Sequence, residues 1–186
     1  MAIHSGRHQF GTDKGRITLR TFRDGLAAQA GHDLTIEATR WSAELVVSPD
    51  HTPASLKVTI DLGALTVRAG TGGIKPLTDR DKREIGVTAR KVLAADRHPE
   101  ATFLATTFKP EAGGGGTVGG TLTLAGRSQP LRLQVAQTGD GTYRATGTVA
   151  QTAFGIKPYT GFFGALKVRD NVNFEVSVDL SQPESS

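Results

Sequence analysis

The strongest constraint on the fold is a repeated alternation of hydrophobic and polar residues. Successive side chains of a β-strand point to opposite faces, so a period of two predicts strands with one hydrophobic side. The clearest case is residues 55–62, SLKVTIDL, in which every second residue is Leu, Val or Ile. The pattern recurs about eight times along the chain. We therefore expect an all-β fold.

Two long strands change parity part-way, which indicates that the sheet is curved. One change falls near Arg40, and the other falls between Ala105 and Phe108. Such a slip is typical of a β-bulge or sharp coil that bends a strand. Short turns rich in Gly and Pro separate the strands, which favours an up-and-down meander whose first and last strands pair. The predicted fold is an eight-stranded antiparallel β-barrel.

One segment, at about residues 78–94, lacks the alternation and is expected to form a single inserted α-helix. Ile85, Ala89 and Val92 recur there at helical spacing. Thr78 and Asp81 resemble a capping box, and the acidic first turn suits a helix N-terminus. The helix follows the third predicted strand, so it is expected to cover one end of the barrel or to lie along its wall.

Length and composition set the scale of the molecule. The 186 residues are 37% hydrophobic and 22% charged, which predicts one domain over residues 1–186 with short flexible termini. The chain has no Cys, and this excludes disulfides, zinc-thiolate sites and thiol catalysis.

Charge and hydropathy narrow the partners and the location. The net charge is +4, but the basic residues are spread among acidic ones and do not gather as a nucleic-acid-binding face requires. The chain shows neither the apolar core of a secretory signal nor a run long enough for a transmembrane segment. We expect a cytoplasmic location, or a periplasmic or secreted one if a signal peptide has been removed.

Small residues on the predicted inward face suggest a hollow interior. They are Ala38, Ala43, Ala101, Ala105, Gly120, Ala145 and Gly147. A barrel of this size either fills with its own side chains or encloses one small ligand. Because large voids are costly, an underfilled apolar lumen suggests a ligand space, and a narrow tube suits a chain-like lipid. Collapse of the strands into the space is the alternative.

The same parity argument selects candidate ligand contacts. Residues expected to line the lumen are Leu45, Leu56, Val58, Ile60, Phe103, Leu122, Tyr143, Val149 and Phe174. Residues expected near an opening are Trp41, Phe154, Phe162 and Phe163. The last three belong to the aromatic-rich loop 153–168, for which four roles stay open: a plug in the barrel mouth, a lipid contact, a dimer contact, or packing onto the core.

His32 and Asp33 are the only residues that suggest catalysis, as a hydrolase dyad. Such a dyad needs a nucleophile, a base within hydrogen-bond reach and oxyanion donors. Neighbours on a strand point to opposite faces, and the chain has no Gly-x-Ser-x-Gly elbow. We expect no catalytic residues and no enzyme activity. The two other interpretations are a turn that precedes a strand, and a His32 side chain that orients a lipid headgroup.

Metal and nucleic-acid sites are not expected. His4 and His8 are four residues apart, but their segment has no helical pattern and is interpreted as a frayed tail. His51 and His98 have no carboxylates grouped near them. A barrel that binds single-stranded nucleic acid needs exposed aromatics, whereas most aromatics here fall on the hydrophobic parity. No metal and no cofactor other than a bound lipid is predicted.

Four motifs in order resemble a known family over residues of about 15 to 181. They are VTID at 58–61, HPEATF at 98–103, GTLTLAGRSQP at 120–130 and AFGI at 153–156. Together they resemble the YceI-like family, bacterial lipid-binding proteins with an extended, lipocalin-like barrel. The chain departs from the family pattern in its helical insertion, which has Gly86 and the pair Val92-Leu93 where members often have His and a Phe-Phe pair.

The resemblance implies binding, storage or transport of a long-chain hydrophobic molecule in the lumen. The implied ligands are a polyisoprenoid, an isoprenoid quinone precursor or a fatty-acid derivative, and no reaction is implied. Many members are periplasmic. The resemblance alone also suggests a homodimer.

Overall fold

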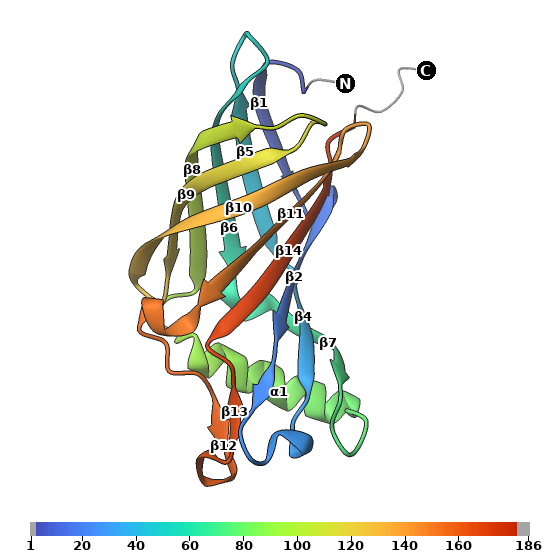
Figure 1. Cartoon of the computed structure of the whole chain (residues 1–186). Coiled ribbons are helices and arrows are strands. Elements are labelled where there is room, and N and C mark those ends of the chain that lie inside the picture. Colours follow the sequence, from blue (N-terminus) through green and yellow to red (C-terminus); the bar gives the residue numbers. More distant parts are fainter. Residues whose placement is uncertain (1–2, 182–186) are drawn as a thin grey trace.

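The alternating segments form one antiparallel sheet that curls round on itself (Figure 1). The computed structural model describes residues 3–181. The strands of this sheet are β1 (Gly6–Gly11), β2 (Gly15–Thr21), β4 (Asp33–Ala38), β5 (Trp41–Val47), β6 (Pro53–Asp61), β7 (Leu65–Thr71), β8 (Glu100–Pro110), β9 (Gly116–Leu124), β10 (Arg127–Gly139), β11 (Thr142–Ala150) and β14 (Asn171–Asp179).

Eleven strands make up this sheet, and they amount to long strands that follow one another round a barrel. β1 and β2 lie end to end beside β5 and β4, which in turn lie end to end beside β6 and β7. The ring continues from β6 through β8, β9, β10, β11 and β14, and β14 pairs with β2 to close it. The predicted antiparallel barrel is confirmed, but the count of eight is wrong for the separate strands because three long strands are each interrupted once.

The predicted bends are where the structure interrupts or bulges a strand. Thr39 and Arg40 separate β4 from β5, and the register of β8 against β9 shifts between Ala105 and Thr107. A further interruption, the 3₁₀ turn η2 (Leu62–Ala64), separates β6 from β7. The parity slips therefore located two of the places where the sheet turns.

The single helix, α1 (Asp79–Val92), lies where the sequence predicted it. The Thr78 hydroxyl accepts a hydrogen bond from the Asp81 N–H at 3.1 Å, and the Asp81 carboxylate accepts one from the Thr78 N–H at 2.8 Å. This capping box satisfies backbone donors that the first helical turn leaves free. α1 packs against β7 and crosses one end of the barrel (Figure 1). We call this the α1 end, and the opposite end the β1 end.

A second, small sheet at the α1 end was not predicted. It contains β3 (Arg23–Asp24), β12 (Thr160–Gly161) and β13 (Leu166–Val168). Three 3₁₀ turns accompany it, namely η1 (Ala28–Ala30), η3 (Gln151–Phe154) and η4 (Phe162–Gly164). Strands of two or three residues are too short to show an alternation, so their sequences gave no signal.

The N-terminal segment is a strand, and its interpretation as a frayed tail is wrong. β1 pairs with β5 from Gly6 to Gly11, and the ring of Phe10 meets that of Trp41 edge-on with centroids 6.2 Å apart. These backbone and aromatic contacts hold a segment that has too little alternation of its own. The rest of the predicted flexible termini, residues 1–2 and 182–186, lies outside the described residues.

Candidate ligand-binding cavity

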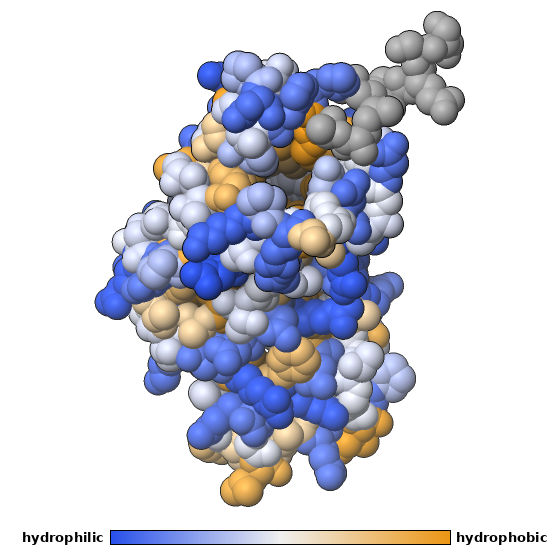
Figure 2. All heavy atoms as spheres, turned by 45° about the horizontal axis from the view of Figure 1, so that its top comes forward, coloured by the Kyte–Doolittle hydropathy of each residue, from blue (hydrophilic) through white to orange (hydrophobic). Residues whose placement is uncertain are grey.

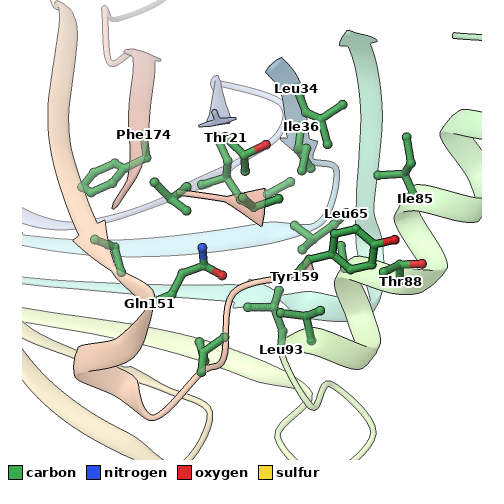
Figure 3. Close-up of a pocket in the computed structure, with 18 of the residues that line it drawn as sticks. Thr21, Leu34, Ile36, Leu65, Ile85, Thr88, Leu93, Gln151, Tyr159 and Phe174 are labelled. Carbon is green, nitrogen blue, oxygen red and sulfur yellow. The ribbon is translucent and has the colours of Figure 1, made fainter. Parts of the chain in front are cut away.

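A cavity of about 680 Å³ occupies the α1 end of the barrel. Its walls come from the strands of the main sheet and from one face of α1, and most of its lining is aliphatic. Figure 3 shows Ile85 of the helix and Leu93, the residue that caps its C-terminus, at the edge of the space, with Leu34, Ile36 and Leu65 from the strands around it. Volumes of this size are typical of sites that enclose a small organic ligand.

The interior is hollow because its large side chains do not close over one another. Among residues 3–181, no large side chain is less than 2% exposed, although the barrel wall is continuous. Leu34, Val58 and Ile60 face inward and remain only half-buried. A close-packed core of this size would leave several such side chains without any accessible surface. The accessible surface they retain is the cavity wall.

Two of the small inward residues do not mark empty space, contrary to the expectation from sequence. A Cβ atom on Gly120 would lie 2.8 Å from Cε2 of Phe103, and one on Gly147 would lie 2.5 Å from Cζ of Phe174. The missing side chains make room for aromatic rings, which pack across the strand. The volume is therefore free mainly where α1, rather than another strand, closes the barrel.

A few polar groups point into this hydrophobic space. Thr21 and Gln151 both project into the cavity in Figure 3. The hydroxyl oxygen of Thr21 is buried and makes no hydrogen bond with any other described residue. Gln151 is 8% exposed, and its side-chain amide donates to the carbonyl oxygen of Arg169 at 3.0 Å. Thr21 thus offers a donor and an acceptor to a molecule in the cavity.

Asp170 fixes the turn that carries Gln151. Its carboxylate accepts hydrogen bonds from the Thr152 N–H at 2.7 Å and from the Thr152 hydroxyl at 2.6 Å, and its carbonyl oxygen accepts one from the Gln151 N–H at 3.0 Å. The bonds from the Thr152 side chain and backbone hold the pKa of Asp170 below its ordinary value. The carboxylate is therefore charged at neutral pH and keeps η3 against the start of β14.

Three loop segments, residues 22–32, 71–77 and 157–168, contribute solvent-exposed residues to the lining of the cavity, and we call them the mouth. Hydrogen bonds join these segments. Nε2 of His32 lies 2.7 Å from the carbonyl oxygen of Lys75, and the Ala27 N–H donates to the carbonyl oxygen of Ala165 at 2.9 Å. Arg23, Lys75 and Lys167 line the cavity from these segments, and Asp81 and Glu84 line it from the start of α1, so the charged side chains of its lining stand at this rim while the interior is apolar.

His32 and Asp33 do not form a dyad. The His32 ring bonds the carbonyl oxygen of Lys75, whereas the Asp33 carboxylate accepts from the Arg23 N–H at 2.9 Å. Because a carbonyl oxygen only accepts, Nε2 of His32 carries the proton in this bond. Each side chain thus ties down a different loop of the mouth, and His32 also lines the opening.

The structure brings half of the predicted ligand contacts to the cavity. Those that line it are His32, Val58, Ile60, Phe103, Leu122, Val149 and Phe174. Those that do not line it are Trp41, Leu45, Leu56, Tyr143, Phe154, Phe162 and Phe163. Parity placed most of them on the inward face correctly, but it does not report how far along the barrel a residue lies.

The misplaced residues fall into three groups. Leu45 and Leu56 lie opposite each other toward the β1 end, and Trp41, opposite Ile60, is buried against Phe10 instead of lying near an opening. Tyr143 lines a separate, more polar pocket of about 480 Å³ at that end, and burial raises its pKa.

The aromatic loop divides into a buried and an exposed part. Phe154 packs into the core from η3, which agrees with the interpretation of a loop on the core, and Ile156 is buried beside it. Phe162 and Phe163 lie in η4 with their side chains in solvent, beyond the cavity. The loop does not plug the cavity, although Tyr159 lines it.

The sequence analysis did not identify the residues of α1 and β4 that line the cavity. Ile85, Thr88 and Leu93 line the cavity from the helix, and Leu34 and Ile36 line it from β4. A signal was available for the helix, because its one hydrophobic face has nothing but the barrel to cover.

Comparisons with known proteins agree with this architecture. The family model described as YceI-like domain matches residues 12–180. The chain belongs to the YceI-like domain family. Its fold is that of a barrel that binds hydrophobic ligands, so a binding protein is the general class to which the chain is assigned.

Individual relatives are distant. A UPF0312 protein of Shewanella sp. (strain MR-4) is 29% identical over 112 residues, which are 58% of this chain and 53% of the relative. The chain thus matches about half the length of that relative. The crystal structure of Burkholderia cenocepacia BcnA superimposes with a TM-score of 0.63 at 20% identity, covering 90% of this chain and 97% of that one. A Campylobacter jejuni YceI protein gives 0.59 at 20% identity, covering 80% and 85%.

Membrane-spanning helices and metal sites are two further possibilities for residues 3–181. No helix in this range is long and apolar enough to cross a membrane. No three His, Asp or Glu side chains in the same range are grouped so that they could hold a metal ion. His4 and His8, which the sequence analysis considered as a pair of metal ligands, are joined differently: Nε2 of His8 lies 2.7 Å from the His4 carbonyl oxygen.

Proposed function

We propose that the protein binds a long-chain hydrophobic molecule in the cavity and stores or transports it. The proposed ligands are a polyisoprenoid, an isoprenoid quinone precursor or a fatty-acid derivative. The observation that carries this proposal is the cavity of about 680 Å³ with an aliphatic wall at the α1 end. Transfer of a hydrocarbon chain from water to such a wall gains about 25 cal/mol for each Å² of apolar surface removed from water.

The position of the polar groups supports an amphiphile with its chain inside. The rim carries Arg23, His32 and Lys75, whereas the deep wall around Phe103 and Phe174 is apolar. A polar headgroup placed at the rim keeps its hydrogen bonds, and a hydrocarbon chain needs none in the interior. A wholly polar metabolite would lose bonds to water inside the cavity and would find few replacements.

Native mass spectrometry of the freshly purified protein, followed by lipid extraction and identification, tests the proposal. We expect an adduct with the mass of one long-chain lipid, released by organic solvent. Protein that carries no lipid and binds none of a panel of isoprenoid alcohols and fatty acids would contradict it. A panel of esters is assayed in parallel, and turnover that is lost in a folded His32→Ala variant would favour an enzyme instead.

A further inference from the structure

The mouth of the cavity is surrounded by exposed hydrophobic side chains. Leu26 is 101% exposed, Ile74 76%, Phe162 63% and Phe163 112%. Each lies near the tip of one of the three mouth segments, and the partly exposed Tyr159 lies beside them. Of the seven large exposed hydrophobic residues in the described chain, only Val87 and Leu104 lie elsewhere. The exposed apolar surface is therefore concentrated around one opening.

This concentration is visible on the surface. Figure 2 shows hydrophobic atoms at the lower tip of the molecule, set among hydrophilic ones. The tip is the α1 end, where the loops extend beyond the barrel (Figure 1). Large apolar side chains that protrude into water mark surfaces that contact a partner or a membrane.

The backbone of η4 adds a second, independent observation. Phe162 and Phe163 have φ angles of 49° and 55°, in the left-handed region that bulky side chains rarely adopt. Neither side chain is buried, so packing within the chain does not explain the conformation. Strained backbone of this kind tends to occur at functional sites, where it presents a side chain. Here it directs two adjacent aromatic rings away from the protein.

The charges around the mouth are mainly positive. Lys75, Lys157 and Lys167 are exposed and form no ion pair with another described residue. Arg23 lies 3.9 Å from Asp33, and Asp24 is the one acidic residue within the three segments.

The neighbouring helix start does not cancel this charge. The first six residues of α1, DRDKRE, carry equal numbers of basic and acidic side chains. Among them, Arg80 pairs with Glu84 at 2.9 Å and Lys82 with Asp79 at 3.7 Å. The three unpaired lysines therefore give the rim a net positive charge.

We propose that the mouth docks on an anionic lipid bilayer. Leu26, Ile74, Phe162 and Phe163 insert at the level of the headgroups, where aromatic and aliphatic side chains on loop tips are stabilised. The lysines lie against the negative surface. In this orientation the cavity opens directly toward the lipid, so a hydrophobic molecule enters or leaves without crossing water.

A bilayer fits these features better than a second copy of the chain does. The hydrophobic side chains stand on separate loops and do not form the flat, self-complementary patch that a symmetric dimer needs. A two-fold axis through the mouth would also bring Lys75, Lys157 and Lys167 close to their own copies, which like-charge repulsion disfavours.

Co-sedimentation with vesicles tests the proposal. The purified protein is mixed with vesicles of phosphatidylcholine alone or of phosphatidylcholine with phosphatidylglycerol. We expect affinity for the anionic vesicles to be higher by about tenfold or more, and to fall as salt is raised, because salt screens the lysines. The measurement needs no bound cargo, so its result is independent of the proposed ligand binding.

Paired variants separate the mouth from the rest of the surface. Phe162→Ser with Phe163→Ser is expected to lower vesicle affinity by about tenfold or more. Val87→Ser with Leu104→Ser removes two exposed hydrophobic side chains elsewhere and is expected to leave affinity unchanged.

Lys75→Glu with Lys157→Glu should abolish the preference for anionic vesicles. Lys109→Glu with Arg132→Glu makes the same change in net charge away from the mouth and should preserve that preference.

Three results would overturn the proposal. The first is equal vesicle binding by the mouth variants and the wild type, with circular dichroism confirming that all are folded. The second is no binding of the wild type to either vesicle. The third is a wild-type dimer in analytical ultracentrifugation that Phe162→Ser with Phe163→Ser converts to a monomer, which would assign the surface to a second copy.

Discussion

The β1 end and the α1 end of the barrel are built from the same alternating strands but differ in what they enclose. Toward the β1 end, Leu45, Val47 and Ala105 are buried to 7% or less. Toward the α1 end, Leu34 faces a cavity and stays half-buried, although Ile17 and Ile36 of the same wall are buried to 5% or less. Strand pairing surrounds the β1 end on most sides, whereas a helix and three loops complete the wall of the α1 end.

The difference shows where side-chain contacts form a packed core and where they leave a cavity. Alternation creates a hydrophobic inner face along the whole barrel. How densely that face is packed then depends on whether another strand or the helix lies across the barrel from it. At the β1 end, rings and aliphatic side chains meet other strands at close range. At the α1 end, α1 packs against the outer strand β7, and side chains of β4 and of the helix face each other across the cavity. Four experiments sharpen this contrast, in order of decreasing expected effect.

The largest effect is expected from a matched pair of deletions. Leu45→Ala leaves a void in close-packed surroundings and should lower the free energy of unfolding by about 3 kcal/mol. Leu34→Ala removes the same atoms from a wall that already faces a cavity, so about 1 kcal/mol is expected. Urea unfolding followed by circular dichroism measures both, and equal losses would show that the two ends are packed alike.

Two adjacent glycines test how tightly the wall is built. A Cβ on Gly120 would lie 2.4 Å from the carbonyl oxygen of Leu104, a backbone atom that cannot give way, so Gly120→Ala should cost about 2 kcal/mol. A Cβ on Gly119 would have its nearest neighbour, Cβ of Thr107, at 3.5 Å, which is an ordinary contact. Gly119→Ala is therefore the control and should change the free energy of unfolding little. A reversed order would mean that the register of β9 against β8 is different.

Filling the cavity should reduce ligand binding without weakening the fold. Thr88→Phe places a ring in the space that Figure 3 shows beside Tyr159, and it should raise the Kd for a bound lipid by about tenfold, or 1.4 kcal/mol. Val87→Phe adds a ring on the exposed side of the same helix and serves as the control. Displacement of a fluorescent fatty acid measures both variants. Unchanged binding in Thr88→Phe would place the ligand elsewhere.

The smallest effect concerns the turn that holds Gln151, and it depends on pH. Since hydrogen bonds from Thr152 lower the pKa of Asp170, its stabilising effect is complete above the ordinary value of 3.8 and is lost as the pH falls through the lowered one. Thr152→Ala should cost no more than about 1 kcal/mol at pH 7, because Asp170 is partly accessible to solvent, and less at pH 2.

A neutral hydrogen bond provides the comparison for that measurement. The Thr148 hydroxyl donates to the side-chain oxygen of Asn173 at 3.0 Å, and neither group titrates. Thr148→Ala should therefore cost the same at both pH values. Unfolding in urea at the two pH values decides, and a pH-independent cost for Thr152→Ala would contradict the assignment.

The same contrast explains how far the sequence could predict the structure. Most of the long strands, the bend at Arg40 and the capping box at Thr78 depend on local patterns and were predicted. β1 and the small sheet depend on partners that are distant in sequence, so no local pattern revealed them.

The candidate site was predictable only in part, for a related reason. Val58, Ile60 and Phe103 were assigned to the lumen because parity fixes the face of a strand. The position of a residue along the barrel axis depends on strand tilt and on the position of α1, and the alternation predicts neither. That is why Leu45 was predicted in the lumen and Trp41 near an opening although neither lines the cavity, whereas Thr88 and Leu93 line it and were not predicted.

The absence of fully buried large side chains in residues 3–181 has a consequence for thermal stability. A hydrocarbon chain that fills the α1 end would act as part of the hydrophobic core, and unfolding would have to release it. By thermodynamic linkage, the ligand would then add about 2.7 kcal/mol to the free energy of unfolding when its free concentration is one hundred times the Kd. The melting temperature would rise with the free ligand concentration. The fraction of protein with a ligand in its cavity and the melting temperature would rise together, so a melting curve would report on both.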